Sequence, residues 1–291
     1  MRTGEQITGD LRALGIAEGD VVLARAALRA LGPVDGSRGE ILLGALLEAV
    51  GPGGTIVGLA HTAVGKPSDR DNVFHRDSPC ITGGFAATML KWPGAFRSTH
   101  PTNSMVAIGR DAESLLRSHD EKSTCFAPLR AIIESNGKMV LIGCVDASPG
   151  FSTVHYAHEQ LGLADKSLLR GLRGAYYEKD GQVRWFARND VPGCSRGFGA
   201  FYPLYRAQGA LKAGKVGDAD SALIKAADAY AIESRAIRAA PRVSLCDRPD
   251  CASCRGTKLF NVRDMWTYYL RRPRRAGIFL LAARHALRPG G

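Results

Sequence analysis

Residues 151–159 are the strongest candidate in the chain for acid–base chemistry. They read F-S-T-V-H-Y-A-H-E and follow an apolar run at 139–143 that predicts a short buried strand. Within seven residues the segment presents Thr153, His155, His158 and Glu159. Histidine titrates near neutral pH, and the end of a strand can hold a reactive side chain at an exposed edge. The alternative is a helix that begins here, with Ser152 or Thr153 as its N-cap and a partly buried histidine.

A second group of reactive side chains lies near the C-terminus. Cys246, Cys251 and Cys254 follow the spacing C-x4-C-x2-C, and the C-x-x-C part is typical of a structural zinc site. Three thiolates need a fourth ligand to close a tetrahedral site, and four leave no open position for water or substrate. Such an ion would fasten the C-terminal segment to the core and take no part in catalysis. The alternative is a set of unrelated thiols.

The composition is that of a soluble globular chain of 291 residues, with 45% hydrophobic and 23% charged residues. No segment approaches the roughly 18–20 apolar residues that a membrane-spanning helix needs, and the N-terminus lacks the apolar core of a secretion signal. We therefore expect a cytoplasmic protein whose cysteines are reduced or metal-bound. The net charge of +11 suits an anionic ligand, cofactor or membrane surface. With 7% aromatic residues and no basic helix, we expect no nucleic-acid partner.

The order of apolar runs and turns predicts an α/β fold with mixed sheets and most of the chain in one unit. Helices are expected at 5–17, 38–50, 84–91, 127–134 and 219–240, strands at 21–24, 55–59, 105–109 and 139–143, and a hairpin at 175–178 and 183–186. The opening β-α-β order is compatible with a parallel pair of strands. Residues 60–84 are irregular, polar and long enough to be a functional loop.

Four motifs occur in the order that one family has them. They are L-G-I-A-E-G-D-V-V-L-A-R-A-A-L-R-A-L-G, then A-L-L-E-A-V-G-P-G-G-T-I-V, then R-S-T-H-P-T-N-S at 97–104, and G-K-M-V-L-I-G followed by S-T-V-H. On these motifs the chain resembles the aminoglycoside 3-N-acetyltransferase family, and a weaker similarity to the apramycin-type branch follows them. The resemblance implies a layered, mixed-sheet antibiotic N-acetyltransferase-like fold with a helical, cysteine-rich C-terminal segment. It also implies transfer of acetyl from acetyl-CoA to an amine.

The resemblance places the catalytic histidine of the family at His155. Thr153 takes the hydroxyl position before it, and Asp190 falls where the apramycin-type branch has an acidic active-site residue. A neutral imidazole would accept the proton of the substrate amine, and a carboxylate would fix its tautomer. The Thr153 hydroxyl or backbone N–H groups would stabilise the oxyanion. Glu159 is the alternative carboxylate, and direct transfer does not need Cys144 as a nucleophile.

The resemblance also implies where acetyl-CoA binds. The family typically ends its first strand with H-S-S, and this chain has Arg25, Ala26 and Ala27 there. Their backbone N–H groups remain, and Arg25 could pair with a phosphate of CoA. An ordinary surface salt bridge of Arg25 is the alternative. The cosubstrate is further expected to contact Arg97, Ser98 and Ser104 of the central motif.

The acceptor amine is expected to contact Asp71, His75 and Glu159. Arg70 and His75 stand where relatives that bind polycationic antibiotics place acids. Together with the positive net charge, they favour a neutral or anionic acceptor, such as a nucleotide- or lipid-linked amino sugar of polysaccharide biosynthesis. The alternatives are an aminoglycoside 3-N-acetyltransferase that confers antibiotic resistance and a degenerate, non-catalytic member that no longer binds CoA.

The resemblance and the charge pattern also bear on the fourth zinc ligand and on the C-terminal tail. The apramycin-type branch has a cysteine at the place of Cys194, which makes this residue the expected fourth zinc ligand. We divide the chain into an acetyltransferase domain at 1–262 and a basic amphipathic tail at 263–291. The tail reads R-R-P-R-R at 271–275 beside an apolar run at 278–281, which suits peripheral contact with an anionic membrane. A packed terminal helix or a homodimer contact is the alternative.

Overall fold

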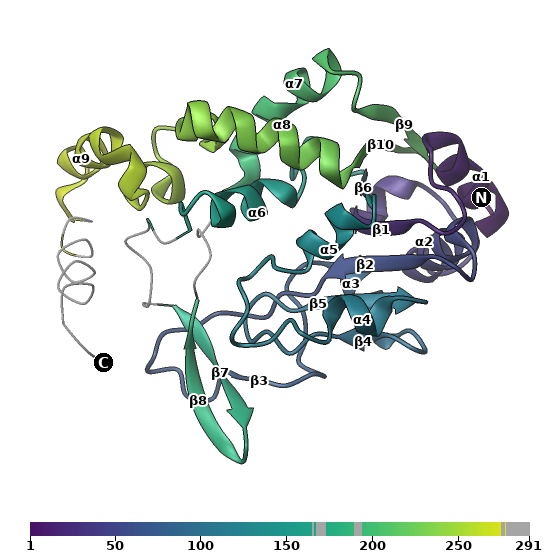
Figure 1. Cartoon of the computed structure of the whole chain (residues 1–291), viewed down its shortest axis with the longest axis horizontal. Helices are drawn as coiled ribbons and strands as arrows, with labels where there is room; N and C mark the ends of the chain where they lie inside the picture. The colour runs from purple at the N-terminus through teal and green to yellow at the C-terminus, as the bar shows by residue number, and fades with distance from the viewer. Residues whose placement is uncertain (165, 167–172, 189–193, 275–276, 278–291) are drawn as a thin grey trace.

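The computed structural model describes residues 1–164, 166, 173–188, 194–274 and 277, and it contains two sheets (Figure 1). The larger sheet has the spatial order β4 (Phe96–Arg97), β5 (Met105–Gly109), β2 (Thr55–Leu59), β1 (Val21–Ala26), β6 (Lys138–Ile142), β10 (Ala219–Lys225) and β9 (Lys212–Val216). The smaller sheet has the order β3 (Val73–Phe74), β7 (Gly174–Lys179) and β8 (Gln182–Ala187). The predicted α/β fold with mixed sheets is confirmed.

The centre of the larger sheet is parallel. β1 pairs in parallel with β2 on one side and with β6 on the other, so the carboxyl ends of all three strands lie at one edge. Val21 and Leu23 face one hydrophobic core, and Val22 and Ala24 face the other, because successive side chains of a strand point to opposite faces. A strand that is covered on both faces must be apolar throughout, and V-V-L-A meets that demand.

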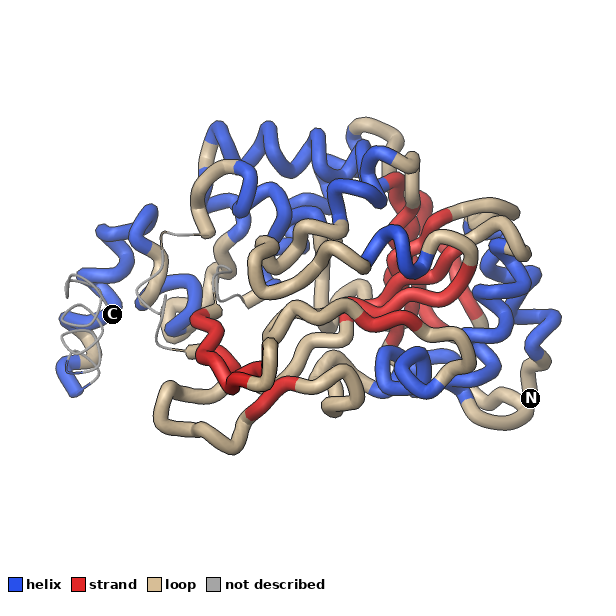
Figure 2. Tube along the Cα trace, turned by 60° about the horizontal axis from the view of Figure 1, so that its bottom comes forward, coloured by secondary structure: helices blue, strands red, loops and turns tan. Residues whose placement is uncertain are grey.

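Helices cover both faces of the larger sheet (Figure 2). One face carries α1 (Gly4–Leu14), α2 (Arg38–Val50) and α3 (Gly84–Lys91). The other carries α4 (Ala112–Leu116), α5 (Leu129–Glu134), α6 (Thr153–Gln160), α7 (Tyr202–Ala207) and α8 (Ala226–Ala239). Short turns of helix are η1 (Leu28–Leu31), η2 (Ser195–Phe201), η3 (Pro241–Ser244), η4 (Ala252–Gly256) and η5 (Leu259–Asn261). In the described part of the chain, no helix is long and apolar enough to cross a membrane.

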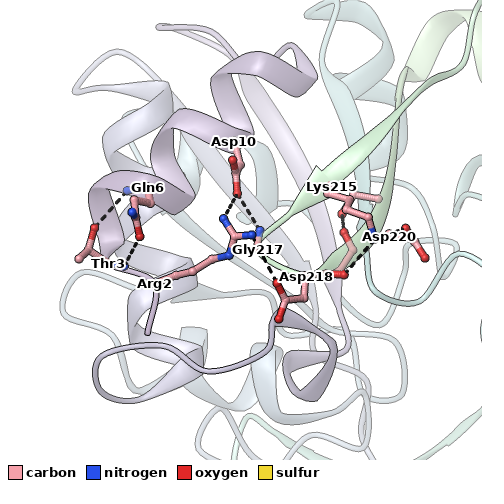
Figure 3. Close-up of polar contacts among 10 residues, drawn as sticks. Arg2, Thr3, Gln6, Asp10, Lys215, Gly217, Asp218 and Asp220 are labelled. Carbon is pink, nitrogen blue, oxygen red and sulfur yellow. Dashed lines mark hydrogen bonds and ion pairs between the residues drawn. The ribbon is translucent and has the colours of Figure 1, made fainter.

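Helix α1 is linked to the hairpin of β9 and β10 by polar contacts at the surface (Figure 3). The backbone N–H of Gly217 donates to Asp10 at 2.8 Å. Arg2 lies between Asp10 and Asp218, at 3.8 and 3.4 Å from their carboxylates. Exposed ion pairs of this kind contribute about 1 kcal/mol or less, so the apolar side of α1 does more to hold it.

Most of the predicted elements are confirmed. The helices at 38–50 and 84–91 and the strands at 55–59 and 105–109 have the predicted bounds, and the predicted hairpin forms β7 and β8. The first helix ends three residues earlier than predicted, because Gly15 adopts a left-handed conformation with φ of 117° and ends it.

The prediction of one long helix at 219–240 is wrong. Its first seven residues form β10, which pairs antiparallel with β6 and with β9, and only then does α8 begin. Alanine-rich sequence favours a helix, but the side chains of Ala222, Leu223 and Ile224 are buried in the sheet. Tertiary packing therefore overrides local propensity here.

The contact between α2 and α3 predicts opposite effects for two glycines of one helix. A Cβ at Gly39 would lie 2.2 Å from Oγ1 and 3.2 Å from Cβ of Thr88, whereas a Cβ at Gly44 would meet no atom within 4 Å. We expect Gly39→Ala to destabilise the fold by about 1–3 kcal/mol through overpacking. Gly44→Ala should stabilise it by about 0.5–1 kcal/mol through helix propensity. Chemical denaturation of both variants measures this. Equal or reversed effects would contradict the close approach of α2 to α3.

Candidate active site

A cavity of about 440 Å³ opens at the edge where the carboxyl ends of β2, β1 and β6 meet. This edge of an open α/β sheet is where such folds usually bind ligands. The three strand ends contribute Ala24, Arg25, Ala26, Leu59, His61 and Cys144 to its wall. The start of α3 contributes Phe85 and Ala86, and the entry to α6 contributes Phe151, Ser152 and His155.

His155 lies in the first turn of α6 and faces this cavity. Its ring stacks on Phe126, with 4.6 Å between centroids and 7° between planes, and meets the edge of Phe198 at 5.0 Å. Burial, followed by the nearby His158 and His61, holds the pKa of His155 well below its ordinary value of 6.5. The imidazole is therefore neutral at pH 7, which is the form that can accept a proton.

The hydroxyl beside His155 belongs to Ser152 and not to Thr153. Thr153 is fully buried and does not line the cavity. On a strand, residues two apart share a face, but this segment is a helix, where residues two apart project in different directions. Ser152, three residues before His155, lies on the same side and lines the cavity. The expected oxyanion role of Thr153 does not fit this geometry.

The carboxylate partner of His155 is not found among the described residues. Asp190, the predicted partner, lies outside them. Glu159 does not line the cavity, and its Oε1 accepts the backbone N–H of Phe126 at 3.1 Å. Glu159 thus supports the ring on which His155 stacks, which differs from the predicted roles in tautomer control and acceptor binding. Within the described part of the chain, no carboxylate lines the cavity.

Arg25 puts a positive charge into the cavity wall. Its guanidinium donates to the carbonyl of Gly150 at 3.0 Å and to the carbonyl of Ser148 at 3.2 Å. The same loop is held from the other side by Tyr202, whose hydroxyl donates to the carbonyl of Val145 and accepts the N–H of Gly150. The loop after β6 is thereby fixed against the end of β1. The alternative of an ordinary surface salt bridge for Arg25 does not fit this arrangement.

The strand ends beside Arg25 offer few other polar groups. Ala26 lines the cavity, but the N–H of Ala27 donates to the carbonyl of Ile142 at 2.9 Å and is not free for a cosubstrate. Cys144 also lines the cavity. Burial raises the pKa of its thiol above the ordinary value, so the thiolate needed of a nucleophile is disfavoured.

The side chains of Arg97, Ser98 and Ser104 are buried outside the cavity. Arg97 donates to Oγ of Ser104 at 3.1 Å, to the carbonyl of Ala60 at 2.9 Å and to the carbonyl of Arg76 at 3.0 Å. These bonds use the guanidinium to fasten the loop at 60–84 to β4. The expectation that this motif contacts the cosubstrate is therefore not supported by its geometry. Its role is to position the loop.

Asp71 and His75 also lie apart from His155. Neither lines the cavity, and Asp71 is exposed on the loop before β3. His75 borders a separate hollow of about 450 Å³ beside the β7–β8 hairpin, together with Tyr177 and Lys179. These positions do not support contact between either residue and an acceptor bound at His155.

His61 is the cavity residue that sequence reasoning missed. It follows β2 by two residues and lines the wall, and its Nε2 is buried with no hydrogen-bond partner among the described residues. Burial, then the charges of Arg188 and His119, lower its pKa to about 3. A polar residue just past the carboxyl end of a parallel strand was the available signal, because that edge carries the site.

The four predicted cysteines meet at one point. The sulfur atoms of Cys194, Cys246, Cys251 and Cys254 all lie within 4.8 Å of one another. A tetrahedral zinc site with Zn–S bonds of about 2.3 Å has sulfurs about 3.8 Å apart, so the cluster fits a zinc ion with a small contraction. Cys194 directly precedes η2, the turn that brings Ser195 and Phe198 to the cavity.

Known proteins share the sequence pattern and the fold of this chain. A family model described as aminoglycoside 3-N-acetyltransferase matches residues 23–238. Aminoglycoside N(3)-acetyltransferase III of Serratia marcescens is 32% identical over 213 residues, covering 65% of this chain and 76% of that protein. The crystal structure of aminoglycoside acetyltransferase AAC(3)-Xa superposes with a TM-score of 0.70 at 27% identity, covering 81% of this chain and 92% of the other. AAC-IIIb in binary complex with CoASH gives 0.69 at 25%, covering 82% and 97%.

The family match spans more than half of the chain, and the solved structures have the layered fold that the resemblance implied. The chain belongs to the aminoglycoside 3-N-acetyltransferase family and is an acetyl-CoA-dependent N-acetyltransferase.

Proposed function

We propose that the enzyme acetylates a primary amine of a neutral or anionic amino sugar, such as a nucleotide- or lipid-linked one. The observation that carries this proposal is the charge of the cavity. Arg25 lines it, the histidines beside it are neutral at pH 7, and no carboxylate of the described residues is present. A polycationic acceptor needs carboxylates, and a cation in the wall repels it. Arg25 instead suits a phosphate, of the acceptor or of CoA.

His155 is the proposed general base. As the amine nitrogen bonds to the acetyl carbonyl carbon, the nitrogen becomes acidic and gives its proton to the neutral imidazole. The thioester C–S bond then breaks, and the CoA thiolate takes that proton. Stacking on Phe126 holds the ring in place, and the Ser152 hydroxyl in the cavity wall would donate a hydrogen bond to the oxyanion. The products are an amide and free CoA, so atoms and charge balance without a covalent enzyme intermediate.

An aminoglycoside acceptor is the second candidate, and the names of the relatives favour it. Two observations weigh against it in this chain: no carboxylate is found among the described cavity residues, and Asp71 does not line the cavity wall. The non-catalytic reading rests on the replacement of H-S-S by Arg25, Ala26 and Ala27. A formed cavity around a neutral histidine argues against it.

We further propose that the four cysteines bind a structural zinc ion. Four thiolates saturate the ion, so it can hold η2 and η4 together but cannot activate water. Cys194 is on the η2 side, and Cys251 and Cys254 belong to or adjoin η4. The ion would thus link the cavity wall at Phe198 to the C-terminal segment.

The acceptor class can be tested by measuring CoA release from acetyl-CoA with a panel of amines. We expect nucleotide-linked amino sugars to give a kcat/KM at least ~10-fold above kanamycin, gentamicin and apramycin, because one repelled or attracted charge at partial burial is worth about 1.4 kcal/mol or more. Preference for the three antibiotics would establish the aminoglycoside reading instead.

The base can be tested with His155→Ala and His155→Phe. Both should lower kcat at least ~100-fold, because the proton acceptor is lost. His155→Phe can still stack on Phe126, so it should keep the thermal stability and the acetyl-CoA affinity of the parent, measured by calorimetry. Near-normal turnover of either variant with a confirmed substrate would remove His155 from the mechanism.

The zinc site can be tested with Cys251→Ser and, as a matched control outside the cluster, Cys80→Ser. Parent and control should contain about one zinc per chain by metal analysis, and Cys251→Ser much less. At a free zinc concentration 100-fold above the Kd, binding stabilises the folded protein by about 2.7 kcal/mol. The free energy of unfolding of Cys251→Ser should therefore be lower by about that amount. Well below its melting temperature, its kcat should fall less than ~10-fold. A larger loss in kcat, or a parent without zinc, would contradict a structural ion.

A further inference from the structure

Helix α9 (Val262–Leu270) presents a row of apolar side chains to solvent. Val262 is 45% exposed, Trp266 59% and Leu270 79%, and Leu259 in the preceding turn is 39% exposed. The spacing of three, four and four residues puts them on one side of the helix. They make up four of the eight large apolar side chains that are exposed in the described part of the chain. We call these four residues the outer face of α9.

The opposite side of α9 is fixed to the cysteine-rich segment. Met265 and Tyr268 are buried, and the hydroxyl of Tyr269 donates to the carbonyl of Gly256 at 2.9 Å. Asp264 accepts from Arg242 at 2.9 Å. Because these contacts fix the rotation of the helix, the exposure of the outer face follows from the fold. Figure 1 shows α9 at one end of the molecule, beyond the helices that cover the sheet.

The C-terminal part of the sequence carries most of the excess charge of the chain. Residues 251–291 hold 9 of the 39 lysines and arginines but 1 of the 28 acids, so they contribute +8 of the net +11. That one acid, Asp264, is paired with both Arg242 and Arg255. On and just after α9, Arg263, Arg271 and Arg274 are exposed.

We propose that the outer face of α9 docks on an anionic phospholipid surface. A helix with tryptophan and aliphatic residues on one side and arginines around it lies in the interface of a bilayer, where the apolar side enters the headgroup boundary. Each basic residue near an anionic surface adds about 1 kcal/mol. A second copy of the chain is a poorer occupant, because a two-fold contact would bring the same arginines together. Nucleic acid would use the arginines but leave the apolar row in water.

This docking does not depend on the identity of the acceptor. It would concentrate the enzyme where lipid-linked sugars are made, and it would equally hold for an enzyme with a water-soluble acceptor. Failure of the amine panel and failure of membrane binding are therefore separate results.

The test is co-sedimentation of the full chain with vesicles. We use phosphatidylcholine alone and phosphatidylcholine with 30% phosphatidylglycerol, at low and at high salt. The parent should bind the anionic vesicles at least ~10-fold more tightly than the neutral ones, and salt should weaken the binding. Trp266→Ser/Leu270→Ser should weaken it at least ~10-fold more, because two apolar side chains no longer leave water. Val183→Ser, a similarly exposed position on β8, should bind like the parent.

Thermal melting should show that each variant is folded, because Val183, Trp266 and Leu270 are all exposed. The proposal is overturned if the parent does not sediment with anionic vesicles at low salt. It is also overturned if the double variant binds like the parent, since charge alone would then account for the binding. A parent that is dimeric by light scattering and ignores vesicles, with a monomeric double variant, would assign the outer face to self-association.

Discussion

The parallel pairing of β1 with β2 and β6 is the constraint on which the site depends. Because these strands run the same way, Arg25, His61 and Cys144, which come from distant parts of the sequence, reach one edge of the sheet. An antiparallel neighbour would place its amino end at that edge instead. The hydrogen bonds from Arg25 to Ser148 and Gly150 then hold the loop after β6 against β1. Helix α6 follows this loop, and its first turn faces the cavity. The geometry of the cavity is thus a consequence of strand direction.

Burial sets the chemistry at that edge. The cavity histidines His61 and His155 have pKa values lowered chiefly by loss of water, and the nearest charges are positive. Both effects favour the neutral ring, so neither histidine needs a carboxylate to be a proton acceptor at pH 7. In the proposed mechanism the cost is a weaker base, which is acceptable because the proton comes from a nitrogen that becomes acidic as it bonds to the acetyl carbon. The proposed anionic acceptor would meet a cavity wall that carries positive charge at Arg25.

The sequence predicts the parts of this structure that depend on local pattern. Apolar runs predict the central strands within a residue or two, and the ordered motifs point to His155, which lines the cavity. Where the structure differs from these expectations, the difference depends on contacts between distant parts of the chain. The resemblance implies an oxyanion role for Thr153, but the segment forms a helix in which Thr153 is buried and Ser152 lines the cavity. The resemblance implies that Arg97 contacts the cosubstrate, and nothing local in R-S-T-H-P-T-N-S indicates that its guanidinium donates to the carbonyls of Ala60 and Arg76. β10 was taken for a helix because its partner β6 lies about 80 residues earlier.

The cysteine cluster connects the wall of the cavity to the segment that holds α9. Cys194 begins the turn whose Phe198 meets the edge of His155, while Cys254 lies in the turn against which α9 packs. His158, on the same helix as His155, bonds to Ser244 on the approach to Cys246. Ser244 donates its hydroxyl hydrogen to the carbonyl of Pro241, so Nε2 of His158 must be the donor in that bond. Burial lowers the pKa of His158 to about 3, so its ring is neutral at pH 7. Whatever holds the four sulfurs together therefore fixes both the wall beside His155 and the orientation of the outer face of α9.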